Sequence, residues 1–313
     1  MDNIAVLIPC YNEQNTIRKV VEDFKNALPT AQIYVYDNNS TDNTIAEAEA
    51  AGAIVRKEPR QGKGNVLRTM FRDIDARCYI ITDGDDTYPS SYASQMAEQV
   101  LEHKADMVIG DRLSSTYFTE NKRAFHNFGN VLVRRLINML YKSDIKDVMT
   151  GYRAFGYKFA KTFAILSKGF EIETEMTIHA LDKNLLIKNI PIDYRDRPQG
   201  SASKLNTYSD GFKVLKTIFI LFKNYKPFNF FMWMSLIMLL TAVGFLIPVM
   251  ADYIKTGLVP KLPSFVACVF FAICSILSFF EALNLDTLKQ KERREFEYWF
   301  NLWAEKERNF TTK

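Results

Sequence analysis

The sequence is poor in the residues that build disulfide scaffolds and transition-metal sites. Its 313 residues include only 4 cysteines, and no two of them form a CxxC pair. Only 3 histidines are present. These numbers exclude a disulfide-rich secreted scaffold and disfavour a zinc cluster or a His-rich metal centre.

Two phosphate-binding fingerprints and a strongly basic charge are also missing. No GxGxxG follows the first apolar segment, and GxxxxGK[ST] is absent, which argues against a hydride-transferring dinucleotide fold and a P-loop. The 40 basic residues nearly balance the 36 acidic ones, for a net charge of +4. This balance disfavours nucleic acid as a partner, because nucleic-acid binders concentrate positive charge on one face.

What the chain does contain is distributed unevenly. Its mean hydropathy of −0.13 is that of an ordinary soluble protein, yet residues 227–251 and 262–280 contain no charged side chain. A membrane-spanning helix needs about 20 apolar residues, so the sequence predicts a two-helix transmembrane hairpin at 227–251 and 262–284. Two buried core helices are the alternative, which two such runs in tandem disfavour.

Basic residues outside the two predicted spans predict their orientation. Lysines precede the first span, and Lys289, Lys291, Arg293 and Arg294 follow the second. The positive-inside rule then places both termini and a domain at 1–205 in the cytoplasm, in a multi-pass protein of the inner (plasma) membrane. Residues 206–226 have apolar and lysine-rich faces, which predict an amphipathic helix on the membrane surface or, alternatively, packed on the domain. Residues 285–313 predict a cytoplasmic amphipathic tail.

Residues 1–110 alternate between two hydrophobic periods. Short apolar segments lie at 3–8, 32–37, 53–57, 78–82 and 106–110, and helical spacing separates them. Strands that alternate with helices predict an α/β fold with a Rossmann-like, mostly parallel sheet. Ligands of such sheets bind beyond the carboxyl ends of the strands, so a site is expected there.

Polar clusters follow three of these strands, at 9–13, 37–42 and 83–88. In the third, Asp83, Asp85 and Asp86 repel one another unless a cation is bound, and hard carboxylate oxygens suit Mg²⁺ or Mn²⁺. A solvated turn that caps the helix after Pro89 is the alternative. The presence of the other two clusters at the same sheet edge favours binding of a metal and a diphosphate.

The ordered set IPCYNE, DNNSTDNT, GKG and TDGDDTYP resembles the family 2 glycosyltransferases of the GT-A fold over residues 3–110. DVMTGYRAF at 147–155 resembles the D-x-x-[ST]-G-[FY]-R-x-[FY] motif of polyprenyl-phosphate glycosyltransferases, and RPQGSASKL at 197–205 resembles a further segment of theirs. Dolichyl-phosphate mannose synthases and bacterial undecaprenyl-phosphate glucosyltransferases share these motifs. With the two spans, the resemblance covers essentially the whole chain.

The resemblance implies roles for individual residues. The donor nucleotide is expected to contact Pro9, Tyr11, Glu13, Asp37, Lys63 and Asp83. The divalent cation, Mg²⁺ or Mn²⁺, is expected on Asp83 and Asp85. The acceptor phosphate is expected on Arg112, Arg197, Ser203 and Lys204. The catalytic residues are expected to be Asp85, Arg153 and, as the candidate base, Asp147.

Several of these residues have a plainer interpretation. Arg153 would otherwise pair with a carboxylate. Glu171, Glu173 and Glu175 either have a substrate role or simply begin a helix, whose dipole favours acids there. Thr87 stands where mannose synthases of archaeal type have Gln, and a hydroxyl is a weaker metal ligand.

The implied reaction is inverting transfer of one hexose from a nucleotide sugar, UDP-glucose or UDP-N-acetylglucosamine, to undecaprenyl phosphate at the cytoplasmic membrane face. The product, a sugar-phosphate-polyprenol, would serve cell-envelope glycan modification. A lipid phosphate is already anionic at neutral pH, so catalysis would rest on the metal and on positioning rather than on a strong base. The alternatives are direct transfer to a glycolipid or polysaccharide and a non-catalytic membrane scaffold. A homo-oligomer is a further possibility.

Overall fold

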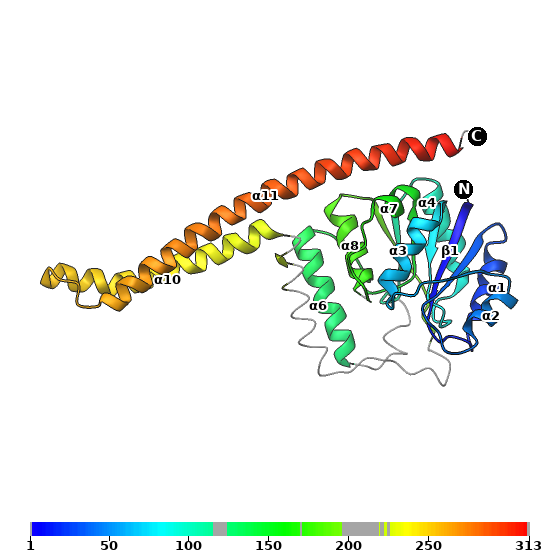
Figure 1. Cartoon of the computed structure of the whole chain (residues 1–313), viewed down its shortest axis with the longest axis horizontal. Helices are drawn as coiled ribbons and strands as arrows, with labels where there is room; N and C mark the ends of the chain where they lie inside the picture. The colour runs from blue at the N-terminus through cyan, green and yellow to red at the C-terminus, as the bar shows by residue number, and fades with distance from the viewer. Residues whose placement is uncertain are drawn as a thin grey trace. The chain divides into compact units, whose positions relative to one another are not determined.

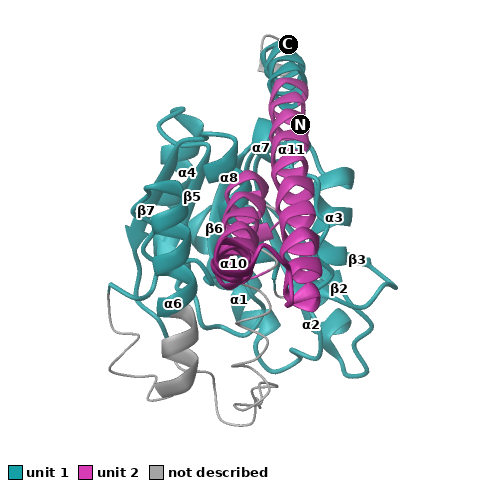
Figure 2. Cartoon of the chain, turned by 90° about the vertical axis from the view of Figure 1, so that its left-hand side faces the viewer, with its two compact units in different colours: residues 1–211, 296–313 teal, residues 212–295 magenta. Residues whose placement is uncertain are grey.

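The computed structural model describes residues 2–114, 124–169, 171–195, 219, 222–223 and 226–311, with the side chains of 124–130 and 310–311 excepted. The chain divides into two compact units (Figure 2). Unit 1 comprises residues 1–211 and 296–313, and unit 2 comprises residues 212–295.

Unit 1, with its helices and strands drawn in Figure 1, is built on a seven-stranded sheet. The strand order is β3-β2-β1-β4-β6-β5-β7. The strands are β1 (Asp2–Cys10), β2 (Gln32–Asp37), β3 (Ile54–Lys57), β4 (Ala76–Ile81), β5 (Met107–Asp111), β6 (Arg153–Gly156) and β7 (Ile187–Pro191). β6 runs antiparallel to β4 and β5, and all other neighbours are parallel. The predicted mostly parallel α/β sheet is therefore confirmed, and β6 and β7 are additions that the sequence did not predict.

Helices cover both faces of this sheet. They are α1 (Ile17–Ala27), α2 (Thr44–Ala50), α3 (Lys63–Asp73), the 3-10 turn η1 (Ser90–Tyr92), α4 (Ala93–Leu101), α6 (Ala124–Tyr141), α7 (Tyr157–Thr162) and α8 (Ile172–Asp182). α1 and α4 bury their apolar residues with the side chains of alternate β1 positions, Ile4, Val6 and Ile8. On α3, Phe71 makes edge contacts with Tyr79 and Phe155, with ring centroids 5.7 and 6.0 Å apart. Alternate residues of a strand face opposite sides, so both faces of the central strands are buried.

Unit 2 consists largely of two long helices, α10 (Pro227–Thr256) and the first part of α11 (Leu262–Thr311). Both are long and apolar enough to cross a membrane, and only 11% and 22% of their most apolar windows are buried. The hydroxyls of Ser235 and Ser275 each donate to the other residue's carbonyl at 2.9 Å. Such small hydroxyl residues satisfy polar groups between helices in lipid.

The second long helix continues beyond the predicted end of the span at 284. α11 is uninterrupted as far as Thr311, and its residues from 296 onward belong to unit 1. There, Phe296 packs on His179 and Trp303 on Tyr157, with ring centroids 5.4 and 5.8 Å apart. The end of the predicted amphipathic tail therefore lies against the sheet domain. Most of the segment predicted at 206–226 lies outside the described residues.

Candidate active site

Five strands bring Pro9, Asp37, Asp83, Arg112 and Arg153 to one edge of the sheet. β1, β2, β4 and β5 end there, and β6 begins there because it is antiparallel. Its first residue, Arg153, pairs with Ile81 and Ile109 near the ends of their strands. The loops after Cys10, Asp37, Ile81 and Asp111 consequently meet the segment 147–153.

The first two loops are held together by side-chain hydrogen bonds. Asn12 has a left-handed backbone with φ 57°, a conformation that asparagine tolerates. Its N–H donates to Ser40 Oγ at 2.9 Å, and its Oδ1 accepts from the N–H of Thr41 at 2.8 Å. Thr16 Oγ1 then donates to the carbonyl of Gly84 at 2.7 Å, which ties the acidic loop to the same assembly.

The carboxylates of these loops surround Cys10. Burial raises the pKa of this thiol well above its ordinary value, and the negative charges of Glu13, Asp37, Asp83 and Asp85 raise it further. The thiol is therefore a buried packing group rather than a nucleophile. Pro9 is half-buried beside it, and Tyr11 is exposed at the edge of the site.

Asp37 carries an unused acceptor in the interior. Its side chain is buried, with 2% of the residue exposed. Oδ2 accepts from the N–H of Ser40 at 3.2 Å, whereas Oδ1 has no hydrogen-bond partner among the described residues. A buried acceptor without a donor costs free energy of folding. Asp37 Oδ1 can therefore accept a hydrogen bond from a group outside the described residues.

Lys63 occupies the centre of an ionic cluster. Its Nζ lies 2.6 Å from Asp83 Oδ1 and 2.6 Å from Glu173 Oε1. Burial lowers the pKa of Lys63, but ion pairing with Asp83 and Glu173 outweighs it, so the pKa is raised. A Cβ at Gly151 would lie 2.7 Å from Asp83 Oδ2 and 3.0 Å from Lys63 Nζ, which explains the glycine there.

The GKG turn is fixed by close backbone packing. The N–H of Gly64 donates to the carbonyl of Lys168 at 3.1 Å. A Cβ on Gly64 would lie 2.1 Å from the carbonyl oxygen of Ser167. The turn therefore requires small residues, and it delivers Lys63 at the first position of α3.

Asp85 and Thr87 form a tight local pair. Thr87 Oγ1 donates to Asp85 Oδ1 at 2.6 Å, and both residues are buried. The Thr87 hydroxyl thus orients Asp85. Within the part of the chain that the structure describes, no three His, Cys, Asp or Glu side chains are grouped as a complete metal site. Mg²⁺ and Mn²⁺ commonly take only one or two carboxylates plus substrate phosphates, and Asp83 with Asp85 fits that donor set.

Arg112 and Asp147 form a second, buried ion pair. Arg112 Nε and Nη2 donate to Asp147 Oδ2 and Oδ1 at 2.7 and 3.2 Å. Asp147 is fully buried and also accepts from the N–H of Met149. Tyr88 adjoins the pair, because its hydroxyl accepts from Arg112 Nη1 at 3.4 Å and from the N–H of Gly151 at 3.0 Å. In this arrangement the Asp147 carboxylate orients Arg112, and its role as the base stays a prediction.

Arg153, also predicted to be catalytic, is enclosed in the same way. It is fully buried, and burial lowers its pKa to about 10. Its guanidinium donates to the carbonyls of Thr150 and Val148 at 3.0 and 2.6 Å and to Thr177 Oγ1 at 2.8 Å. Arg153 thus joins the 147–151 segment to α8, and its catalytic role stays a prediction.

Three predicted residues lie outside the described part of the chain, namely Arg197, Ser203 and Lys204. Two residues of the cluster were not among the predicted site residues. Glu173 is one of three acids at a helix start for which the sequence left a substrate role open, and Tyr88 lies at the end of the acidic loop, which is its only sequence signal.

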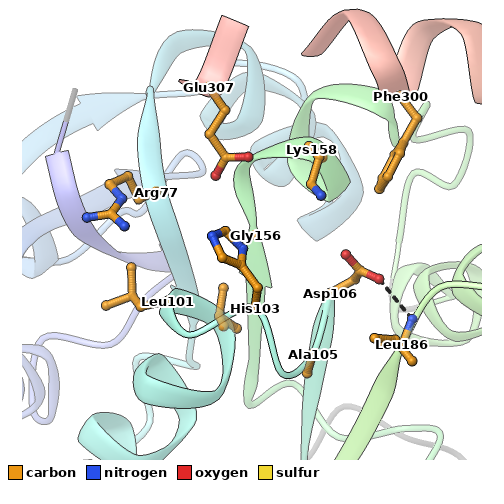
Figure 3. A pocket seen from close by; sticks show the side chains of 11 residues that line it. Arg77, Leu101, His103, Ala105, Asp106, Gly156, Lys158, Leu186, Phe300 and Glu307 are labelled. Atoms are coloured by element: carbon orange, nitrogen blue, oxygen red, sulfur yellow. Dashed lines mark hydrogen bonds between the residues drawn. The ribbon is translucent and has the colours of Figure 1, made fainter. Parts of the chain in front are cut away.

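A separate cavity of about 270 Å³ lies at the opposite edge of the sheet (Figure 3). Arg77 and Gly156 line it at the start of β4 and the end of β6. Phe300 and Glu307 of α11 also line it. Because the parallel strands begin at this edge, the cavity is distinct from the polar site at their carboxyl ends.

The chain is similar to known proteins over much of its length. The glycosyltransferase AglJ of Haloferax volcanii is 32% identical over 231 residues, covering 74% of this chain and 75% of the relative. The dolichyl-phosphate hexose transferase of the same organism is 27% identical, covering 69% of this chain and 92% of the relative.

A solved structure shares the fold. Glucosyl-3-phosphoglycerate synthase of Mycobacterium tuberculosis, in complex with Mn²⁺, UDP-glucose and phosphoglyceric acid, superposes with a TM-score of 0.54 at 19% identity. The match covers 70% of this chain and 79% of that one. The predicted GT-A fold is thereby confirmed. Residues 5–163 match the family described as glycosyl transferase family 2, and the chain therefore belongs to that family.

Proposed function

We propose that this glycosyltransferase moves one hexose from a nucleotide sugar to undecaprenyl phosphate at the cytoplasmic face of the membrane. The observation that carries the proposal is the joint position of Asp83, Asp85, Lys63 and the unpartnered Asp37 acceptor at one sheet edge. Carboxylates and an ammonium group at one place suit a diphosphate that arrives with a divalent cation.

The donor end of the site is proposed to lie over the first two strands. Asp37 Oδ1 is a buried acceptor, which suits an N–H of the base or a hydroxyl of the ribose. Tyr11 is exposed beside it and offers an aromatic surface to the base. Pro9 and Glu13 complete this wall. UDP-glucose and UDP-N-acetylglucosamine are the proposed donors.

The cation, Mg²⁺ or Mn²⁺, would be held by Asp83 and Asp85 and would supply charge stabilisation for the departing diphosphate. In the reaction, a lipid phosphate oxygen forms a bond to the sugar C1 while the bond from C1 to the diphosphate oxygen breaks. The nucleoside diphosphate leaves, and the configuration at C1 of the sugar is inverted. The attacking phosphate is already deprotonated, so the proposal needs no general base, in agreement with the enclosed position of Asp147.

The acceptor phosphate is proposed to bind between Arg112 and the segment 197–204. The Asp147 carboxylate fixes the orientation of Arg112, and an arginine fork suits phosphate oxygens. Arg197, Ser203 and Lys204 are proposed to complete the phosphate site. The name of the dolichyl-phosphate hexose transferase relative supports a polyprenyl phosphate as acceptor.

The membrane part of the proposal rests on α10 and α11. Their exposed apolar side chains are costly in water, and lipid is the environment that covers them. We propose that 227–251 and 262–284 span the inner (plasma) membrane and that both termini and the sheet domain at 1–205 are cytoplasmic. We propose a membrane-surface helix at 206–226 and a cytoplasmic tail at 285–313.

The test is a donor panel. Membranes that contain the protein are incubated with undecaprenyl phosphate, Mg²⁺ or Mn²⁺, and each of several labelled nucleotide sugars. We expect label in the lipid extract with one UDP-hexose and none with Asp85→Asn. Label in a polymer or in a preformed glycolipid would favour direct transfer to those acceptors. No transfer from any donor would favour the scaffold alternative and refute the proposal.

A further inference from the structure

In the ionic cluster of Lys63, Asp83 and Glu173, Glu173 is the one member that has no role in the proposed reaction. It lies in the first turn of α8, and only 6% of its side chain is exposed. Its Oε1 is 2.6 Å from Lys63 Nζ, the same distance that separates Lys63 from Asp83 Oδ1. Lys63 is thus shared equally between two carboxylates, of which Asp83 is a proposed cation ligand.

The two carboxylates differ in exposure. The Asp83 side chain is 29% exposed, whereas those of Glu173 and Lys63 are 6% and 9% exposed. A cation that reaches Asp83 from solvent competes with the Lys63 ammonium for the same carboxylate. Moving Lys63 away from Asp83 is cheap only while a second anion holds it, because a buried, unpaired ammonium is strongly unfavourable.

The backbone of Glu173 is held in place by a series of hydrogen bonds. Thr177 Oγ1 donates to the carbonyl of Glu173 at 3.0 Å and accepts from Arg153 Nη1 at 2.8 Å. Arg153 in turn binds the carbonyls of Val148 and Thr150. The first turn of α8 is therefore braced against the segment that ends at Gly151, the residue on which the Asp83–Lys63 pair packs.

We propose that Glu173 is a positioning residue that retains Lys63 in the site when Asp83 turns to the divalent cation. This inference rests on the proposed function, because it assumes that the divalent cation binds at Asp83 and Asp85. In this scheme, the Lys63 ammonium is paired with the Asp83 carboxylate before the nucleotide-sugar donor binds. The cation then takes over Asp83, and Glu173 keeps the ammonium directed at the diphosphate. Without Glu173, Lys63 can stay paired only by remaining on Asp83.

The experiment measures binding of Mn²⁺ alone to the full-length protein in detergent, from the electron paramagnetic resonance signal of free Mn²⁺. The variants are Glu173→Gln, Lys63→Met and the two combined. Glu171→Gln is the matched control, because Glu171 is exposed on the same helix end and loses the same charge. Thermal unfolding of each variant confirms that it is folded.

We expect Glu173→Gln to weaken Mn²⁺ binding about tenfold, a size typical of coupling between contacting groups. Glu171→Gln should stay within about twofold of the wild-type protein, since exposed charges interact weakly. In the Lys63→Met background, Glu173→Gln should change Mn²⁺ binding by less than about twofold, because the competing ammonium is gone.

A second measurement covers the case in which Lys63→Met does not fold. Acetylation of Lys63 by acetic anhydride is followed by mass spectrometry with and without saturating Mn²⁺. We expect slow acetylation of the wild-type protein in both conditions, and at least about fivefold faster acetylation of Glu173→Gln once Mn²⁺ is present, because an unpaired ammonium is released to solvent.

If Glu173→Gln weakens Mn²⁺ binding equally in the wild-type and the Lys63→Met backgrounds, the inference is overturned. The effect would then be a long-range interaction of the Glu173 charge with the cation. Mn²⁺-independent acetylation in Glu173→Gln would also overturn the inference. If the wild-type protein binds no Mn²⁺, the cation site of the proposed function fails together with the inference. If it binds Mn²⁺ but the cycle is additive, the inference alone fails.

Discussion

Substitutions in the buried Arg112–Asp147 ion pair distinguish a structural role of Asp147 from a role in catalysis. Changing Asp147 to Asn keeps the shape of the side chain but removes the charge that two guanidinium bonds of 2.7 and 3.2 Å contact. Asp147 is fully buried, and the Arg112 side chain is 9% exposed. Arg112 would therefore stay charged in the interior without the Asp147 carboxylate.

Removing one partner of a buried ion pair costs about 3–5 kcal/mol of folding free energy. For a domain of about 200 residues, each kcal/mol lowers Tm by about 2–4 °C, so we expect a decrease of about 6–20 °C. The double variant Arg112→Met/Asp147→Leu removes both charges and should recover most of the loss, because apolar residues of similar volume replace a buried pair well.

The assay is thermal unfolding in detergent with a thiol-reactive fluorophore. Cys10 and Cys78 are buried in β1 and β4, so they react when the sheet opens. A Tm of Asp147→Asn within about 2 °C of the wild-type value would refute the reasoning. Combined with lost sugar transfer, that result would restore Asp147 as a group that acts on substrate.

Three further predictions concern the donor site, the cation site and the docked helix. Asp37→Asn should weaken UDP binding, measured by calorimetry, by about 10- to 150-fold, the value of a hydrogen bond to a charged group, and unchanged binding would contradict the donor assignment. Asp85→Asn should lower kcat of sugar transfer at least about 100-fold without lowering Tm, and normal transfer would remove Asp85 from the cation site. Burial, together with Lys183, lowers the pKa of His179 from 6.5 to about 4. Between these pH values His179 binds a proton in the unfolded chain but not in the folded chain. The free energy of unfolding should therefore fall as pH drops from about 6.5 towards 4. His179→Leu should reduce this loss between pH 7 and pH 5, and an unchanged pH dependence of Tm would show that other groups cause it.

The strand ends were predictable because each combines two simple signals. An apolar run predicts a buried strand, and the polar cluster after Cys10, Asp37 or Ile81 has to lie where the strand leaves the core. The parallel order then places these clusters at a common edge. The loop contacts between Asn12 and Thr41 and between Thr16 and Gly84 are the consequence.

The role of Arg153 was not predictable from local pattern. A charged residue at the start of β6 reads as a surface or substrate-binding group, because arginine is almost never fully buried unless paired. Here backbone carbonyls and a hydroxyl take up its donors instead of a carboxylate. Only the tertiary fold supplies those acceptors.

The pairing of Glu173 with Lys63 and the continuity of α11 were not predicted, for related reasons. Glu173 meets Lys63 across a sequence separation of 110 residues, and no local feature distinguishes it from the neighbouring Glu171. In α11, charged residues after 280 indicate the end of an apolar span, but charge does not end a helix. The helix continues to Thr311, and its aromatic residues dock on α7 and α8.

The most direct test of the central claim is the mass of the intact lipid product. Purified protein is incubated with undecaprenyl phosphate, the active nucleotide sugar and Mn²⁺, and the lipid is extracted for mass spectrometry. The account predicts an acid-labile undecaprenyl phosphate that carries one hexose, absent with Asp85→Asn. Unmodified undecaprenyl phosphate, with the sugar recovered on another acceptor or as free sugar, would contradict it.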